Sequence, residues 1–178
     1  ENVPGGSSII GAQRVAKANP DGYTLMVTTN GTIVANRYLF KTLPYDPDKD
    51  LVPVTQLADI DMILLAHGSL PANNLKELVA LAKKEPGKVS YGSYGNGSQP
   101  HLLLELFNNR ENIQLLHVPY KGLGPALTSV MAGETQLTLT GRGTGEPAIR
   151  SGKTKVLAYM SDKRDPSLPD VPTSAESG

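Results

Sequence analysis

The stretch Tyr91-Gly-Ser-Tyr-Gly-Asn-Gly-Ser-Gln-Pro-His101 joins two segments of different character. The residues before it, 88–91, are typical of a short strand, and the residues after it, 102–107, are typical of a helix. A glycine-rich loop that leads from a strand into a helix directs several backbone N–H groups to one place, where the helix dipole adds partial positive charge. The pattern therefore indicates an anion site, for a phosphate or a carboxylate.

The residue types within this loop favour that interpretation. Gly92, Gly95 and Gly97 can adopt positive φ and let a ligand approach the backbone closely. Ser98 is a suitable N-cap, and Pro100 suits the first helical turn because it has no N–H to lose. A plain strand–helix turn with a helix cap is the alternative that the residue types alone leave open.

Two nucleotide-binding motifs are excluded by their spacing. The order Gly92-x-x-Gly95-x-Gly97 differs from the G-x-G-x-x-G order of a dinucleotide-binding loop. Gly152-Lys-Thr154 matches the last three residues of a P-loop motif, but Pro147 occupies the position where that motif needs its first glycine. The residues that follow, 156–159, are typical of a strand, whereas a P-loop leads into a helix.

The composition argues against several classes of protein. The 178 residues include 17 Lys and Arg against 17 Asp and Glu, and the resulting net charge of zero argues against nucleic-acid binding. No apolar run reaches the roughly 18 residues of a membrane-spanning helix, so we expect no direct membrane insertion. The absence of cysteine excludes disulfides and Cys-ligated metal sites. We expect no metal and no cofactor.

Helix-like and strand-like segments alternate along the chain, which predicts an α/β fold with mostly parallel strands. The expected helices are 9–18 (capped by Ser7 or Ser8), 33–39, a helix from 75 to Pro86 with Asn74 and Glu77 as a capping box, one from 102, 125–132 and 146–151. The expected strands are 23–28, 62–67, 88–91, 114–118, 136–140 and 155–160.

Four polar loops each follow an expected strand: 29–32, 92–98, 119–122 and 141–145. In α/β sheets the ligand binds beyond the carboxyl ends of the strands. Brought together, these loops would line one cleft.

Motifs along the whole chain resemble the solute receptors of tripartite tricarboxylate transporters, the Bug family. The first half contributes Glu1-Asn-x-Pro-Gly-Gly6, Gly11-Ala12 with Val15-Ala-Lys-Ala18, Pro20-Asp-Gly-Tyr-Thr-Leu25, Leu43-Pro-Tyr-Asp-Pro47 and Ala82-Lys83. The second half contributes Pro86-Gly-Lys88, Tyr91-Gly-Ser93 with Gly95-Asn-Gly97, His117-Val-Pro-Tyr-Lys-Gly122, Pro125-Ala-Leu127 and Leu168-Pro-Asp-Val-Pro-Thr173. The combination is specific, although no single motif is.

The resemblance implies a type II periplasmic-binding-protein fold, in which two α/β lobes enclose a ligand cleft. It implies a non-catalytic periplasmic receptor that captures a small carboxylate and delivers it to membrane permease subunits. Family members are longer, and this sequence is similar to their middle. The expected parts are a partial lobe one at 1–55 that lacks the usual first strand and ligand loop, lobe two at 56–160, and a return linker toward lobe one at 161–178.

The resemblance also assigns ligand contacts, position by position. From lobe one it assigns Thr29, Asn30, Gly31 and Thr32. From lobe two it assigns Ser93, Asn96, Gly97 and Ser98, which would hold the carboxylate largely through backbone N–H groups and bridging water, together with His101, Tyr120 and Lys121.

The sequence departs from the family pattern in two places. Gln99-Pro100 replaces the polar pair that often precedes His101, which removes one possible contact. Thr140-Gly-Arg142 replaces a segment that usually carries an acidic residue, and Arg142 could clamp a carboxylate through two parallel hydrogen bonds. A surface arginine in a loop is the alternative.

An enzyme is the main competing class. His101 and Glu105 lie one helical turn apart and could share a metal or a proton, although an exposed pair, or a histidine that caps the helix start, explains them better. No G-x-S-x-G motif is present, and Lys121 is better explained as a solvated or carboxylate-facing side chain than as a Schiff-base amine. Three hypotheses result: a carboxylate receptor, an enzyme acting on a small acid on the same scaffold, and a truncated lobe that folds without binding.

Overall fold

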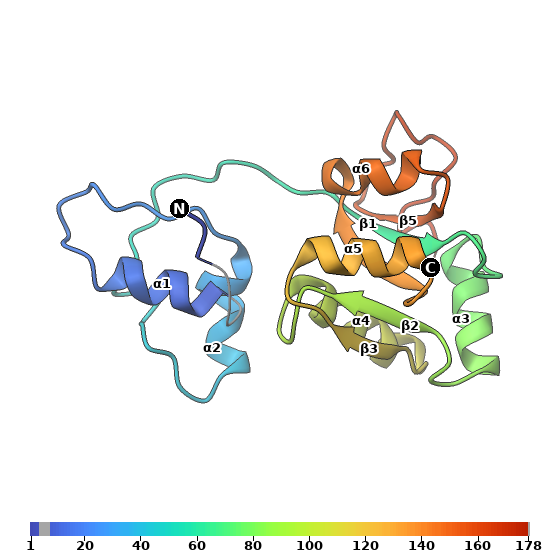
Figure 1. Cartoon of the computed structure of the whole chain (residues 1–178), viewed down its shortest axis with the longest axis horizontal. Helices are drawn as coiled ribbons and strands as arrows, with labels where there is room; N and C mark the ends of the chain where they lie inside the picture. The colour runs from blue at the N-terminus through green and yellow to red at the C-terminus, as the bar shows by residue number, and fades with distance from the viewer. Residues whose placement is uncertain (4–7, 178) are drawn as a thin grey trace. The chain divides into compact units, whose positions relative to one another are not determined.

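The computed structural model describes residues 1–3 and 8–177, and the chain divides into two compact units (Figure 1). The first unit comprises Glu1–Leu57 together with Asn96–Gln99. The second comprises Ala58–Gly95 and Pro100–Gly178.

Among its described residues, the first unit contains three short helices: α1 (Ile9–Ala16), the π-helix η2 (Gly31–Ala35) and α2 (Asn36–Leu39). Ala12 of α1 is fully buried. The Tyr45 hydroxyl donates to the Thr32 carbonyl at 2.7 Å and accepts from the Asn36 side chain at 3.3 Å. Tyr45 thereby fixes the helical segment from inside the unit. Of the two caps considered for α1, Ser8 occupies the N-cap position without a side-chain cap bond, and Ser7 lies outside the described residues.

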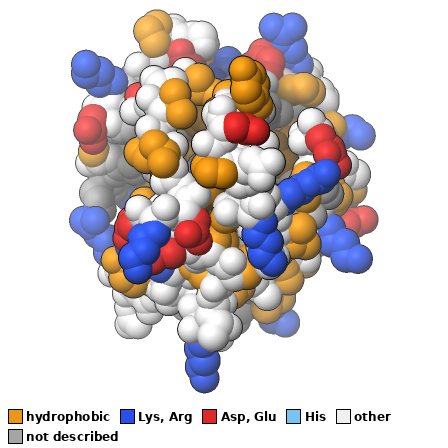
Figure 2. All heavy atoms as spheres, turned by 90° about the vertical axis from the view of Figure 1, so that its left-hand side faces the viewer, with side chains coloured by type: hydrophobic (Ala, Val, Ile, Leu, Met, Phe, Trp, Pro, Cys, Tyr) orange, Lys and Arg blue, Asp and Glu red, His pale blue; other side chains and the backbone are white. Residues whose placement is uncertain are grey.

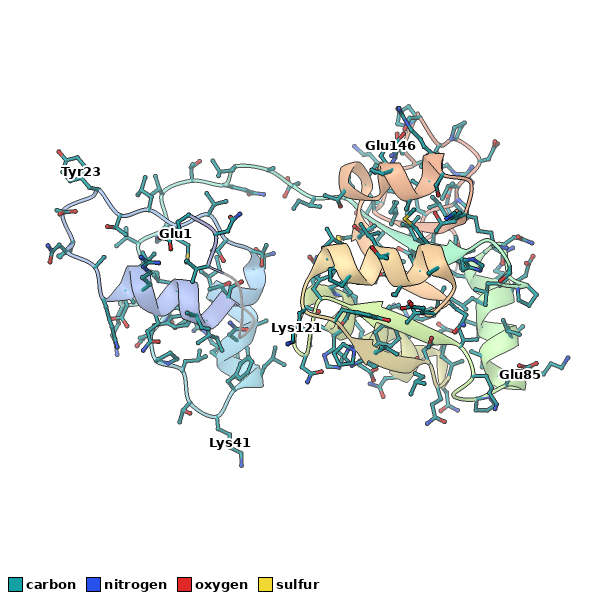
Figure 3. All side chains as sticks on the ribbon, in the orientation of Figure 1. Glu1, Tyr23, Lys41, Glu85, Lys121 and Glu146 are labelled. Carbon is teal, nitrogen blue, oxygen red and sulfur yellow. The ribbon has the colours of Figure 1, made fainter. Side chains whose placement is uncertain are left out.

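The strand predicted at 23–28 is wrong. This segment forms no strand among the described residues, and Tyr23, Leu25 and Val27 are 91%, 73% and 83% exposed. Tyr23 projects from the ribbon in Figure 3, and Figure 2 shows hydrophobic side chains interspersed with charged ones on the face toward the viewer. Alternating apolar residues favour a strand only where a neighbouring strand supplies backbone partners, and the sequence pattern cannot supply one.

The second unit is built on a five-stranded sheet of the order β3-β2-β4-β1-β5. The strands are β1 (Met62–His67), β2 (Ser90–Ser93), β3 (Leu116–Pro119), β4 (Leu137–Gly141) and β5 (Thr154–Met160). Strand β2 pairs in parallel with β3 and β4, whereas β1 is antiparallel to both β4 and β5. Four strands therefore run in one direction and β1 in the other, which confirms a mostly parallel sheet.

Four helices of the described chain connect these strands: α3 (Leu75–Lys84), α4 (Gln99–Glu111), α5 (Leu123–Ala132) and α6 (Arg142–Arg150). Strand β1 explains how they are layered, because its side chains alternate between two apolar clusters. Leu64 belongs to the cluster that includes residues of α3 and α4, and Leu65 to the cluster that includes residues of α5 and α6. The sheet is thus covered on both faces, which is why β1 is apolar from Met62 to Ala66.

The capping box predicted for α3 is confirmed, with one difference. The Asn74 side chain accepts from the Glu77 backbone N–H at 2.9 Å. The Glu77 carboxylate accepts from the backbone N–H of Asn73 at 2.7 Å, one residue before the expected partner. Two backbone donors at the start of the helix are satisfied in this way.

The polar loop predicted at 141–145 is wrong, because α6 begins at Arg142, directly after β4. A β-carbon added to Gly145 would lie 2.9 Å from Thr140 Cγ2 and 3.1 Å from Ile63 Cδ1. This glycine therefore brings the helix close to the sheet instead of bending a loop. The Thr144 hydroxyl donates to the Gly141 carbonyl at 2.9 Å and secures the first turn.

Candidate functional site

Three of the four predicted ligand loops start at the same edge of the sheet. Strands β3, β2 and β4 are adjacent and parallel, so their carboxyl ends at Pro119, Ser93 and Gly141 lie along one edge. The glycine loop follows β2, Tyr120 and Lys121 follow β3, and α6 follows β4. The ends of these strands, with the loops and the helix that follow them along the chain, are the candidate site.

The glycine loop has the backbone conformation that the sequence predicts at two of its three glycines. Gly95 and Gly97 have φ of 128° and 77°, a backbone region that residues other than glycine rarely adopt. The chain then enters α4 at Gln99, so Pro100 lies in the first helical turn as expected. The loop therefore has the strand–glycine–helix arrangement typical of an anion site.

Gly92 has a different role from the one predicted. It lies within β2, and a β-carbon there would approach Ser129 Oγ, Thr135 Oγ1 and Tyr120 Cε2, each at 3.3 Å. Glycine at this position makes room for the neighbouring side chains, including the Tyr120 ring. The Tyr120 backbone N–H donates to the Ser93 carbonyl at 3.0 Å, which holds the loop after β3 against the end of β2.

The Ser93 side chain is fully buried, and its hydroxyl is bonded within the protein. The hydroxyl oxygen accepts from the Gly95 N–H at 3.1 Å and lies 2.6 Å from His117 Nε2, and the hydroxyl donates its proton to the Gly95 carbonyl at 3.1 Å. The hydroxyl therefore shapes the loop. Of the other predicted loop contacts, Asn96 is exposed, Ser98 is half-buried and Gly97 is buried.

His101 and Glu105 do not form the isolated pair considered from the sequence. The His101 ring stacks on the His117 ring with centroids 4.1 Å apart, and His117 also stacks on Tyr91 at 4.9 Å. Glu105 accepts from the Tyr91 hydroxyl at 2.7 Å. Burial, and next the neighbouring His101, lower the pKa of His117, which favours the neutral form of its ring. The sequence alone gives His117 no role beyond its place in the expected strand 114–118 and in the motif that begins there.

Arg142 is held by acidic groups of the second unit. Its guanidinium bonds to Glu146 one turn along α6, donates through Nε to Asp165 at 3.2 Å and reaches the Ser167 hydroxyl at 3.4 Å. Hydrogen bonds from Ser167, first from its backbone, lower the pKa of Asp165, as do the Tyr159 hydroxyl and Arg142. A ligand carboxylate would have to displace two protein carboxylates from this guanidinium.

We therefore expect Arg142→Ala to act on stability. The variant should melt at a lower temperature than the unmodified chain, because Glu146 and Asp165 lose their shared cation, while its affinity for a carboxylate should change less than about twofold. Thermal melts and calorimetric titration measure the two quantities separately. A large loss of carboxylate affinity with an unchanged melting temperature would show instead that Arg142 binds the ligand.

The remaining predicted ligand contacts are Lys121, after β3, and the four residues 29–32 of the first unit. Lys121 is exposed on the loop after β3 (Figure 3). In the first unit Thr29 and Asn30 are exposed, and Gly31 and Thr32 open the π-helix η2. The Thr32 side chain is buried and accepts from the Thr28 hydroxyl at 2.7 Å. Ligand contacts by these residues stay a prediction.

The family model described as tripartite tricarboxylate transporter family receptor matches residues 1–178. The chain belongs to this receptor family. Among curated relatives, the BugT protein of Bordetella pertussis is 35% identical over 179 residues, which cover 100% of this chain and 55% of BugT. The resemblance noted in the sequence is thereby confirmed.

Solved structures of this receptor family share the fold. A structure described as a periplasmic transporter matches with a TM-score of 0.94 and 38% identity, covering 100% of this chain and 60% of the other. MatC from Rhodopseudomonas palustris with bound malate matches with a TM-score of 0.90 and 35% identity, over 100% and 60% of the two chains. An R. palustris protein with adipate matches with a TM-score of 0.91 and 36% identity, over 97% and 58%. The periplasmic-binding-protein fold is therefore confirmed.

This receptor chain spans about half the length of the curated relatives it matches, with 55% and 52% of two of them covered. Within residues 1–3 and 8–177, no helix has the length and apolar character needed to cross a membrane.

Proposed function

We propose that this chain is the ligand-binding part of a periplasmic receptor that captures a small carboxylate without transforming it. The observation that carries the proposal is the glycine loop, which leads from β2 through the positive-φ residues Gly95 and Gly97 into the 13-residue helix α4. Solved relatives with adipate and with malate support a carboxylate as the ligand.

The physics of such a site does not require a charged side chain. The first turn of a helix directs backbone N–H groups outward, and the helix dipole adds about half a positive charge at that end. A carboxylate accepts charge-assisted hydrogen bonds from these donors. We propose that the backbone at 96–98 is the centre of the site, and that Tyr120 and Lys121 also contact the ligand.

We further propose that the complete receptor delivers its ligand to the membrane permease subunits of a tripartite transporter. The family description supports this partner. The location that we propose is the periplasm, in line with the relatives described as periplasmic.

An enzyme is less well supported. Ser93 and His117 are hydrogen-bonded at 2.6 Å, as a nucleophile and its base would be. The Ser93 side chain has no exposed surface, however, so a substrate carbonyl could not reach its hydroxyl. The pair therefore fits a structural role better than a catalytic one.

Thermal melts with malate and adipate test the proposed function, with the uncharged diamide of adipic acid as the control. At a ligand concentration about 100 times the Kd, binding should stabilise the fold by about 2.7 kcal/mol. In a chain of this size the melting temperature then rises by about 5–10 °C. The diamide should give no rise, because it lacks the negative charge.

Two outcomes would contradict the proposal. An equal rise in melting temperature with the diamide would show that the site does not recognise the negative charge. Chemical conversion of the bound acid would show that the protein is an enzyme. The same melts on the full-length receptor test the hypothesis of a truncated lobe. A rise in melting temperature with the full-length receptor but not with residues 1–178 would show that this part folds without binding.

A further inference from the structure

His117 is the middle member of an aromatic column formed by Tyr91, His117 and His101. Tyr91 and His117 lie on the paired strands β2 and β3, and His101 lies on α4. The ring planes are inclined by 25° and 21°, so His117 is stacked against both neighbours. The column joins two strands of the sheet to the helix that follows the glycine loop.

The Tyr91 end of this column is anchored by polar contacts. The Tyr91 hydroxyl donates to Glu105, which also accepts from the Asn108 side chain at 3.3 Å. Asn108 in turn accepts from the Leu115 backbone N–H at 3.0 Å, just before β3. Tyr91, His101 and Glu105 are the titratable groups that the structure places around His117.

The His117 ring reaches the glycine loop through Ser93. The Ser93 hydroxyl has one proton, which it donates to the Gly95 carbonyl. Its oxygen accepts from the Gly95 N–H and lies 2.6 Å from His117 Nε2, which can donate to it in the Nε2–H tautomer. All three contacts are satisfied together when His117 is neutral and carries its proton on Nε2.

We propose that His117 is a positioning residue for the carboxylate-binding loop: its Nε2–H fixes Ser93, and Ser93 fixes the backbone of Gly95. This inference rests on the proposed function of the loop. The loop's N–H groups bind an anion well only if they are held in place before the ligand arrives, since ordering them at binding costs affinity. A side chain on β3 thereby contributes to binding without touching the ligand.

Two variants separate the hydrogen bond from the ring. His117→Gln loses the aromatic stack but keeps an N–H donor at about the position of Nε2, whereas His117→Leu loses both. In the unliganded protein, NMR should show the Nε2–H tautomer of His117 and faster hydrogen exchange of the Gly95 amide in His117→Leu than in His117→Gln. Calorimetry should show malate and adipate bound about three- to tenfold more weakly by His117→Leu, with His117→Gln within about twofold of the unmodified chain.

The two variants and the tautomer of His117 also define the results that would contradict its positioning role. Equal weakening in both variants, or equal Gly95 exchange, would assign the effect to ring packing and overturn the proposal, as would a His117 protonated only on Nδ1. If no carboxylate binds to any version, the proposed function fails, and the Gly95 exchange rates and the tautomer still decide whether His117 positions the loop.

Discussion

Replacing Gly97 by valine is expected to weaken carboxylate binding at least about tenfold, since the loss of one charge-assisted hydrogen bond removes about 1.5–3 kcal/mol. Gly97 has φ of 77°, a conformation in which a β-branched residue is a genuine outlier. The valine would either push the loop out of this conformation or place a β-carbon beside the backbone that the ligand approaches. Isothermal titration with malate or adipate measures the loss.

The structure offers a matched control for this variant. Gly87 has φ of 73°, and a β-carbon there would meet nothing within 4 Å. Gly87→Val therefore introduces similar backbone strain at a position away from the loop. Both variants should melt at a lower temperature, but Gly87→Val should bind as the unmodified chain does. Equal affinity in the two variants would mean that the loop is not in the site.

Replacing Gly145 by valine is expected to destabilise the second unit by about 3 kcal/mol, the upper part of the usual range for overpacking. Even a β-carbon alone would lie 2.9 Å from Thr140 Cγ2 and 3.1 Å from Ile63 Cδ1, in a region that is closely packed between α6 and the sheet. The melting temperature should fall by about 6–12 °C for a chain of this size. Differential scanning calorimetry gives the value directly.

Gly143 is the control on the same helix. A β-carbon there would meet nothing within 4 Å, and valine in a helix is slightly more favourable than glycine. Gly143→Val should therefore leave the melting temperature nearly unchanged or raise it a little. Similar losses at positions 143 and 145 would show that α6 does not pack against β1 and β4 as described.

The parts of the fold that could be predicted from the sequence are those specified by local patterns. The capping box at Asn74 and Glu77 is a side-chain arrangement within four residues, and the structure has it. The apolar run of β1 and the glycine loop before α4 were recognised for the same reason. Each is determined by residues adjacent in the chain.

The parts that were missed depend on contacts between distant residues. The sequence predicts a loop for the glycines before Pro147, because nothing local shows that Gly145 packs on Ile63, 82 positions earlier in the sequence. The contact between His117 and Ser93 joins different strands, and their spacing in the sequence has no recognisable pattern. Arg142 could not be assigned to the Glu146 and Asp165 contacts for the same reason.

An NMR titration of the amide-labelled chain with malate and with adipate tests the central claim most directly, because it observes the backbone N–H groups that we propose as the binding groups. The largest shifts should appear at Gly97 and Ser98, while Gly87 and Gly152, positive-φ glycines elsewhere in the chain, should not move. Saturable shifts centred on other residues, with 95–98 unchanged, would contradict the account.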